Sequence, residues 1–327
     1  MPRAKAKPST RNQNRAYGVP PGSLLDIEPL SLEEITSLFK QAANMHARLE
    51  KKSARQQLSK MLTGRRVALL FYEASTRTRV SFEFAAKNLG AVTTVVTAAA
   101  SSIEKGESLV DTGYTIEATG AEVIVMRHPS SGAAQLLARH MSVPVINAGD
   151  GMHEHPTQAL LDAYTMLRHK KSLRGLRVLI VGDIFHSRVA RSNVQLLSKF
   201  GTHVTLCGPT ALLPELAASL APEVELERNF DRALKTADVI MMLRVQKERL
   251  SGLNLDIAEY VTQYQLTPDR MKSAKRDAIV MHPGPMIRGM EITAEVADGP
   301  QSVIVEQVAN GVPVRMAVLM RALEGSK

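Results

Sequence analysis

Residues 66–90 read RVALLFYEASTRTRVSFEFAAKNLG, and this stretch contains the pattern that decides the fold. Val67–Tyr72 is an apolar run of strand length. Thr78–Leu89 has the length of a helix and is followed by Gly90, which ends helices because it tolerates the left-handed conformation. The stretch therefore predicts a buried strand, a polar turn and a helix.

The same alternation of strand and helix continues along the chain. Further strands are predicted at Val92–Thr97, Glu122–Met126, Val143–Asn147, Val178–Gly182, Val204–Cys207, Val239–Leu243 and Ala278–Met281. Helices of similar length are predicted between them, at Pro156–His169 and at Arg188–Phe200 before Gly201. Alternating strands and helices predict an α/β fold, with mainly parallel sheets covered by helices on both faces.

The length of 327 residues is comfortable for two domains of ordinary size. Lys170–Gly175 is polar and has no apolar face, which is typical of a bridge between two α/β units. We therefore divide the chain near residues 155–172, with the Pro156–His169 helix spanning the hinge and the active site in the cleft between the domains. Ligands of open parallel sheets lie at the carboxyl ends of the strands.

The composition narrows the class of protein. The net charge is +9, but five basic residues and no acid lie in residues 1–17, which leaves +4 for the rest. We interpret residues 1–17 as a basic disordered tail and leave a transit peptide as a lesser alternative. The single Cys207 excludes an internal disulfide and fits a buried strand in a cytoplasmic protein. No apolar run approaches the roughly 20 residues of a membrane span.

Two hydroxyls, an arginine and a third hydroxyl follow the first predicted strand, in the run Glu73-Ala74-Ser75-Thr76-Arg77-Thr78-Arg79. Free backbone N–H groups and the positive end of the dipole at a helix start favour an oxyanion. Arg77 can add a bidentate contact to phosphate. An ordinary helix cap would explain one hydroxyl but not the whole set. This turn therefore predicts a phosphate site.

The order Ser-Thr-Arg-Thr-Arg after a strand resembles the carbamoyl-phosphate signature of the aspartate and ornithine carbamoyltransferases. His155-Pro156-Thr157-Gln158 and the run from Leu243 to Arg249 resemble further motifs of that family, and the resemblance extends from about Leu24 to the C-terminus. It implies binding of carbamoyl phosphate by Ser75, Thr76, Arg77, Thr78, Ser101, Arg127, His155, Gln158, Gly284 and Pro285. Among these it implies catalytic roles for Arg77, Thr78, Arg127 and His155.

The same resemblance assigns the second substrate and the domain boundaries. It implies aspartate binding by Lys105, Arg188, Arg244 and Gln246. The two arginines, Arg188 and Arg244, match the two negative charges of aspartate. Residues 18–155 plus 307–327 would form the carbamoyl-phosphate-binding domain and 156–306 the aspartate-binding domain, with the last helix, about Glu306 to Leu323, packing back on the first domain.

Several motifs allow other interpretations. His153 and His155 suggest a metal, but their spacing does not suit a helical pair and no third ligand stands at typical spacing, so we predict none and interpret His153 as a surface residue. Gly182 follows a strand without the other glycines of a dinucleotide fingerprint, so no cofactor is expected. Where some relatives have His-Pro-Leu-Pro-Arg, this chain has Gly284 and then Met286, which leaves the role of Arg288 open.

The resemblance implies transfer of the carbamoyl group of carbamoyl phosphate to L-aspartate, a step of pyrimidine biosynthesis. It also implies a homotrimer, because Ser101 and Lys105 match residues that reach into a neighbouring subunit's site. A larger assembly with regulatory chains or dihydroorotase stays open. The nearest alternative is an ornithine carbamoyltransferase, whose pocket would need an acidic residue to bind the cationic side chain of ornithine. A nucleic-acid-binding protein is disfavoured by the scarcity of aromatic residues, and a degenerate, non-catalytic transferase by the competent residue at every expected site position. We expect no nucleic acid and no membrane as partners.

Overall fold

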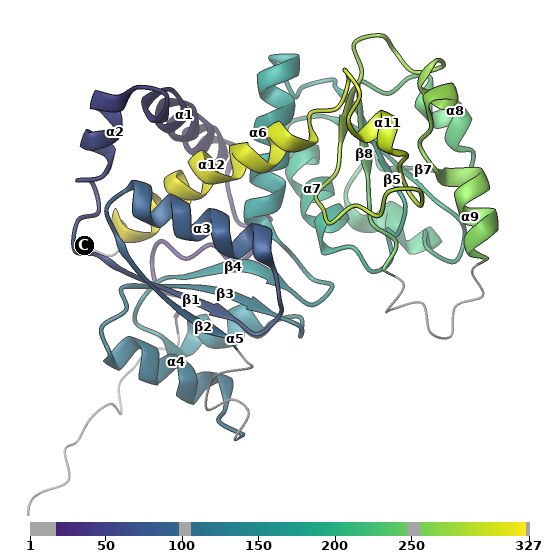
Figure 1. The fold of residues 1–327 in the computed structure, drawn as a ribbon. Coiled ribbons are helices and arrows are strands. Elements are labelled where there is room, and N and C mark those ends of the chain that lie inside the picture. The colour runs from purple at the N-terminus through teal and green to yellow at the C-terminus, as the bar shows by residue number, and fades with distance from the viewer. Residues whose placement is uncertain (1–17, 98–105, 247–255, 325–327) are drawn as a thin grey trace, which may run out of the picture.

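The computed structural model describes residues 18–97, 106–246 and 256–324. Two parallel sheets lie side by side, each with its own helices (Figure 1). The first contains β1 (Arg66–Phe71), β2 (Val92–Thr97), β3 (Val123–His128) and β4 (Val145–Asp150) in the order β2-β1-β3-β4. The second contains β5 (Arg177–Val181), β6 (His203–Cys207), β7 (Glu225–Glu227), β8 (Val239–Met242) and β9 (Ile279–Met281) in the order β7-β6-β5-β8-β9.

The helices occupy the connections that parallel strands require. In and beside the first half they are α1 (Leu32–Leu49), α2 (Lys52–Leu58), α3 (Thr76–Asn88), α4 (Leu109–Ala118), α5 (Ala133–His140) and α6 (Pro156–Lys170). Those that follow are α7 (Arg188–Lys199), α8 (Phe230–Leu234), α9 (Ile257–Tyr264), α10 (Pro268–Met271), α11 (Ala294–Ala297) and α12 (Ile304–Glu324), with a 3₁₀ helix at Glu215–Leu220. The predicted two-domain α/β class is confirmed.

Alternate residues of the first sheet face opposite helical layers, as the pleat requires. Val67, Leu69 and Phe71 of β1 join a core formed with α1, α3, α6 and α12. Ala68 and Leu70 join a second core with α4 and α5. Because both faces are covered, β1 and β3 are nearly continuous apolar runs, whereas every residue of the edge strand β2 is exposed or half-buried.

The first of these cores continues into the second sheet. It includes Val178 and Ile180 of β5, and it is carried between the sheets by α6, α7 and α12. The helix α12 starts beside β9 and then lies against α6, α3 and α1 (Figure 1). Cys207 is fully buried in β6, as predicted. None of the helices within the described ranges is long and apolar enough to cross a membrane.

Most predicted strands shift by one or two residues at their ends, and two strands differ more. β4 continues to Asp150, three residues beyond the predicted end at Asn147, because it keeps pairing with β3 across an irregularity after Met126. β7 was not predicted, since its three residues, Glu225-Leu226-Glu227, have no apolar run and form the sheet edge through pairing with β6 alone.

Candidate active site

A pocket of about 670 Å³ lies where the carboxyl ends of strands from both sheets meet. Its wall is formed by segments that follow β1, β3, β4, β5, β8 and β9, together with the start of α6 and part of α12. The residues predicted from the sequence that line it are Ser75, Thr76, Arg77, Thr78, Arg127, His155, Gln158, Arg188, Arg244, Gln246, Gly284 and Pro285. Ser101 and Lys105 lie outside the described residues.

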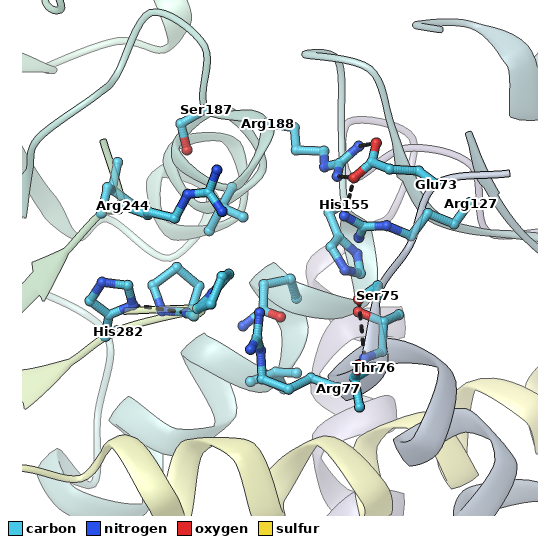
Figure 2. Close-up of a pocket in the computed structure, with 18 of the residues that line it drawn as sticks. Glu73, Ser75, Thr76, Arg77, Arg127, His155, Ser187, Arg188, Arg244 and His282 are labelled. Atoms are coloured by element: carbon cyan, nitrogen blue, oxygen red, sulfur yellow. Dashed lines mark hydrogen bonds and ion pairs between the residues drawn. The ribbon is translucent and has the colours of Figure 1, made fainter. Parts of the chain in front are cut away.

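One end of the pocket is the N-terminus of α3, where the sequence predicts a phosphate site. The Ser75 side chain caps this helix by accepting a hydrogen bond from the Thr78 backbone N–H at 3.4 Å. Arg77 makes no hydrogen bond or ion pair with any residue in the described ranges, and Figure 2 shows it directed into the cavity. Burial, and then the charge of Arg244, lower the pKa of Arg77. The unpaired guanidinium is therefore a receptor for an anion.

Gly284 makes room for Arg77. Its φ is +70°, a conformation that favours glycine, and a Cβ atom there would stand 2.8 Å from Arg77 Nε. Any side chain at this position would therefore meet the guanidinium of Arg77. The loop after β9 and the first turn of α3 are thus fitted to each other across the two sheets.

Glu73 joins two arginines from different sheets. Its carboxylate binds Arg127 and also Arg188, whose Nη1 lies 3.2 Å from Glu73 Oε2 (Figure 2). Burial raises the pKa of Glu73, but the hydrogen bonds and charges of both arginines outweigh it and lower the pKa overall. Burial lowers the pKa of Arg127 to about 10. Glu73 is not among the site residues predicted from the sequence.

His155 precedes α6 and is fully enclosed. Neither ring nitrogen makes a hydrogen bond within the described part of the chain, while its backbone N–H donates to Ser192 Oγ at 2.9 Å. Burial, followed by the charges of Arg127, Arg315 and Arg188, lowers the pKa of His155 well below its usual value. A neutral imidazole with no partner is poised to donate a hydrogen bond to a ligand.

The second sheet supplies the opposite wall. Ser187 caps α7 by accepting a hydrogen bond from Ala190 N at 3.0 Å, and Arg188 follows in the first turn. The buried Asp183 accepts hydrogen bonds from the backbone N–H of His186 and from that of Gln246. These bonds hold the segments after β5 and β8 together, so that Gln246 and Arg244 face the pocket.

Besides Glu73, further polar residues of the pocket region were missed from the sequence. Arg315 of α12 lies at the pocket wall, 3% exposed, and donates to Ser81 Oγ; burial lowers its pKa to about 9. Gln307 of the same helix also lines the pocket, and Asp162 of α6 lies buried behind Gln158. Asp162 and Arg315 could have been found from the sequence, because each is a single charged residue inside an apolar helical run, Leu161-Asp162-Ala163 and Val314-Arg315-Met316.

Two further predictions concern residues away from the pocket. His153 is partly exposed and contacts Asp150, as expected of a surface residue, but the fold also supplies a third group near it. Asp26, His153 and Glu154 each place one ligand atom within 4.8 Å of the others. The absence of a metal stays a prediction. Arg288, whose role was open, pairs with Asp298 at 2.6 and 2.8 Å on the surface.

Two family descriptions match almost the whole described chain. Residues 23–168 match the carbamoyl-P binding domain of aspartate/ornithine carbamoyltransferase, and residues 174–322 match the Asp/Orn binding domain of the same enzymes. The chain belongs to the aspartate/ornithine carbamoyltransferase family. This confirms the resemblance seen in the sequence motifs.

Individual members of the family are similar over most of their length. The aspartate carbamoyltransferase catalytic subunit of Koribacter versatilis is 58% identical over 93% of this chain and 97% of its own. That of Solibacter usitatus is 53% identical over 93% of this chain and 99% of its own. Among solved structures, the Trypanosoma cruzi aspartate transcarbamoylase in complex with carbamoyl aspartate and phosphate has a TM-score of 0.85 and 32% identity, covering 93% of this chain and 97% of that one.

Proposed function

We propose that this protein is an aspartate carbamoyltransferase, which transfers the carbamoyl group of carbamoyl phosphate to the amine of L-aspartate. The observation that carries the proposal is the charge of the pocket. Five arginines line it, namely Arg77, Arg127, Arg188, Arg244 and Arg315, whereas Glu73 is the single acid among the described lining residues. Such an excess of cations fits two anionic substrates bound together.

The choice of aspartate over ornithine rests on the same residues. The side chain of ornithine is a cation and would need an acid, but Glu73 is already held by Arg127 and Arg188. Arg244 and Gln246 stand at the second sheet's end of the pocket, where the β-carboxylate of aspartate would bind. The high identity to aspartate carbamoyltransferases of other organisms supports this assignment.

The reaction needs positioning and electrostatic stabilisation more than side-chain nucleophiles. The amine of aspartate attacks the carbonyl carbon, a C–N bond forms and the carbonyl oxygen becomes an oxyanion. The C–O bond to phosphate then breaks, and the departing phosphate accepts the amine proton. Binding both substrates in one cleft removes much of the entropic cost of their meeting.

We assign the oxyanion site to Thr78, Arg127 and His155. All three line the pocket. The neutral imidazole of His155 makes no hydrogen bond with a described residue, so it can donate to the oxyanion without first breaking another bond. Arg77, with Ser75 and Thr76 at the helix start, would hold the phosphate, and its positive charge stabilises the leaving group.

A product assay on the purified protein tests the proposal. Carbamoyl phosphate is offered with L-aspartate and, in parallel, with L-ornithine. Carbamoyl-aspartate and phosphate formed from aspartate alone are the expected result. Turnover with ornithine alone would contradict the assignment of Arg188 and Arg244, and turnover with neither would contradict the proposed activity.

We also propose a homotrimer with shared active sites, in the cytoplasm. The edge strand β2 exposes Val92 and Val95, and Phe84 of α3 and Tyr114 of α4 are exposed as well. An apolar edge of this kind is suited to contact with a second copy. Ser101 and Lys105 follow β2 in the chain, between the described residues Thr97 and Gly106. Neither Thr97 nor Gly106 lines the pocket of its own subunit.

Hybrid oligomers test the sharing of sites. Arg77→Ala and Lys105→Ala should each have only a small residual activity alone. If one subunit supplies Arg77 and its neighbour Lys105, dissociation and reassociation of the two variants together restores part of the activity, because some sites then receive both native residues. Mixtures that stay at this residual activity, although mass spectrometry shows hybrid trimers, would contradict shared sites.

A further inference from the structure

Asp162 is a buried carboxylate at the meeting point of three helices. It is fully inaccessible to solvent. Its Oδ1 accepts from Gln158 Nε2 at 2.8 Å and from Gln307 Nε2 at 2.7 Å, and its Oδ2 accepts from Asn193 Nδ2 at 2.9 Å. The three donors come from α6, α12 and α7, so one side chain connects elements that build both walls of the pocket.

These bonds determine which end of the Gln158 amide is available to a ligand. An ionised carboxylate can only accept, so the NH₂ group of Gln158 has to face Asp162. The amide is planar, and the oxygen at its other corner, Oε1, accepts no hydrogen bond from any described residue. Since Gln158 lines the pocket, Oε1 is the atom left for the ligand.

Gln307 cannot take the place of Gln158 in this arrangement. Its Oε1 already accepts the backbone N–H of His282 at 2.9 Å, while its Nε2 donates to Asp162. Both ends of that amide are therefore fixed. His282 in turn accepts the Gly284 N–H at 2.9 Å through Nδ1, so the loop after β9 is tied to the same carboxylate.

Asp162 is ionised at neutral pH despite its burial. Burial raises its pKa to about 6, against the opposing effect of hydrogen bonds from Asn193, Gln307 and Gln158 and the charge of Arg315. Two amides on a single oxygen are compatible with the ionised form, because a proton on Oδ1 would displace one of them.

We infer that Asp162 is a positioning residue that orients Gln158 so that its Oε1 accepts a hydrogen bond from the NH₂ of the carbamoyl group, thereby selecting carbamoyl over acetyl groups. The inference rests on the proposed function, in that the pocket takes carbamoyl phosphate. An acetyl group presents CH₃ where carbamoyl presents NH₂, and the carbonyl of Gln158 would then be left without a donor. Sites that hydrogen-bond a substrate group discriminate strongly against analogues that lack it.

Two stable phosphonates test the inference. Phosphonoacetamide and acetonylphosphonate differ only in NH₂ against CH₃, and their dissociation constants can be measured by titration calorimetry on the full chain. The wild-type protein should prefer the amide by roughly tenfold or more, the value of one good hydrogen bond. In Asp162→Asn the preference should fall to within about threefold. The asparagine side chain can donate a hydrogen bond, so the amide of Gln158 can rotate by half a turn and present its NH₂ group to the ligand.

Asn193→Ala is the matched control. It removes a donor to the same carboxylate but leaves the bond between Asp162 and Gln158, and Asn193 does not line the pocket. It should weaken both phosphonates equally and keep the preference. Asp162→Ser serves if Asp162→Asn fails to fold, with thermal unfolding as the check on either variant.

Three outcomes would overturn the inference: a wild-type protein without preference, a folded Asp162 variant with unchanged preference, or an equal loss of preference in Asn193→Ala. The last would mean that general loosening, and not the orientation of Gln158, controls selectivity. The proposed function is tested separately, by turnover of carbamoyl phosphate and aspartate in the wild-type protein. Each of the three outcomes could occur in a protein that still catalyses this reaction.

Discussion

The first turns of α3 and α7 have the same construction but different electrostatics. Each helix follows the first strand of its sheet and is capped by a serine, Ser75 or Ser187, and each brings an arginine into the pocket. Arg77 has no partner in the described chain, whereas Arg188 is bound to Glu73 and to the Gly151 carbonyl oxygen. The proposed phosphate end thus holds an arginine without a counter-charge, whereas at the proposed aspartate end the charge of Arg188 is partly compensated by Glu73, which Arg127 shares.

This difference predicts different binding behaviour at the two ends. An anion at Arg77 gains a charge-assisted contact and displaces no protein group. An anion at Arg188 has to share or replace the Glu73 carboxylate. We therefore expect phosphate-bearing ligands to bind the empty pocket more tightly than aspartate does, and substitutions at the two arginines to affect different steps.

The largest effect is expected at the phosphate end. Arg77→Ala should lower kcat by about 100- to 1,000-fold, the usual cost of losing one preorganised donor. Folding should stay intact, because removing Arg77 breaks no described contact and relieves its repulsion with Arg244. Steady-state kinetics and thermal unfolding measure both. A folded variant with a near-normal rate would contradict the assignment of the phosphate site.

At the aspartate end, Arg188→Ala should raise the KM for aspartate by roughly 10- to 100-fold, as expected for loss of a hydrogen bond to a charged group. The KM for carbamoyl phosphate should change much less, since Arg77 and the α3 N-terminus are untouched. Separate titrations of the two substrates show the split. An equal rise of both KM values would mean that the two ends do not act independently.

Gly284→Ala tests the fit between Arg77 and the loop of the second sheet. The added Cβ would lie 2.8 Å from Arg77 Nε, so we expect carbamoyl phosphate to bind roughly tenfold more weakly. The control is Gly289→Ala, where φ is +86° but no atom lies within 4 Å of the new Cβ.

Both glycine variants should lose stability by about 1–2 kcal/mol, because alanine is strained at positive φ. Urea unfolding measures this loss, and ligand titration measures the affinity. If Gly289→Ala weakened carbamoyl phosphate as much as Gly284→Ala, backbone strain and not the displacement of Arg77 would be the cause.

The smallest effect on the reaction is expected at Glu154, which lies at the junction of the halves. Its Oε2 accepts from Ile27 N at 3.0 Å and from Ser192 Oγ at 3.1 Å, and burial raises its pKa to about 7. A raised pKa means that the contribution of this group to stability is fully present below its unfolded value of 4.5 and is lost as the pH rises through 7.

Glu154→Gln should therefore be more stable than the wild-type protein at pH 8, by an amount on the order of 2 kcal/mol or less. The difference should shrink toward pH 5, where the wild-type carboxyl is protonated. Urea unfolding at the two pH values measures it. A difference that does not change with pH would show that Glu154 does not titrate in this range.

The sequence predicted the parts of the site that are contiguous along the chain. Ser75, Thr76 and Arg77 stand together after an apolar strand, and helix capping and anion binding act over a few residues, so both could be inferred locally. The parallel sheets could be inferred for the same reason, because each strand–helix unit carries its own pattern.

The contacts that the sequence could not predict join distant residues. Glu73 and Arg188 are 115 positions apart, and Ser81 and Arg315 are 234 apart. No local pattern indicates which arginine a buried acid will meet, since the partner is chosen by the packing of the sheets. The role of Asp162 was missed for the same reason, because its partners Gln307 and Asn193 are distant in the sequence. Only the presence of an acid in an apolar helix was visible in the sequence.

The position of α12 has a consequence for the order of events during synthesis. This helix is made after both sheets, yet it fills the space beside α1, α3 and α6 and brings Gln307 and Arg315 to the pocket. While residues 304–324 are still within the ribosome, the nascent chain holds both sheets but leaves the apolar surface of the first half uncovered. Chaperone binding to nascent chains should therefore persist until this last helix emerges, and a ribosome that stalls before it yields a chain without a complete pocket.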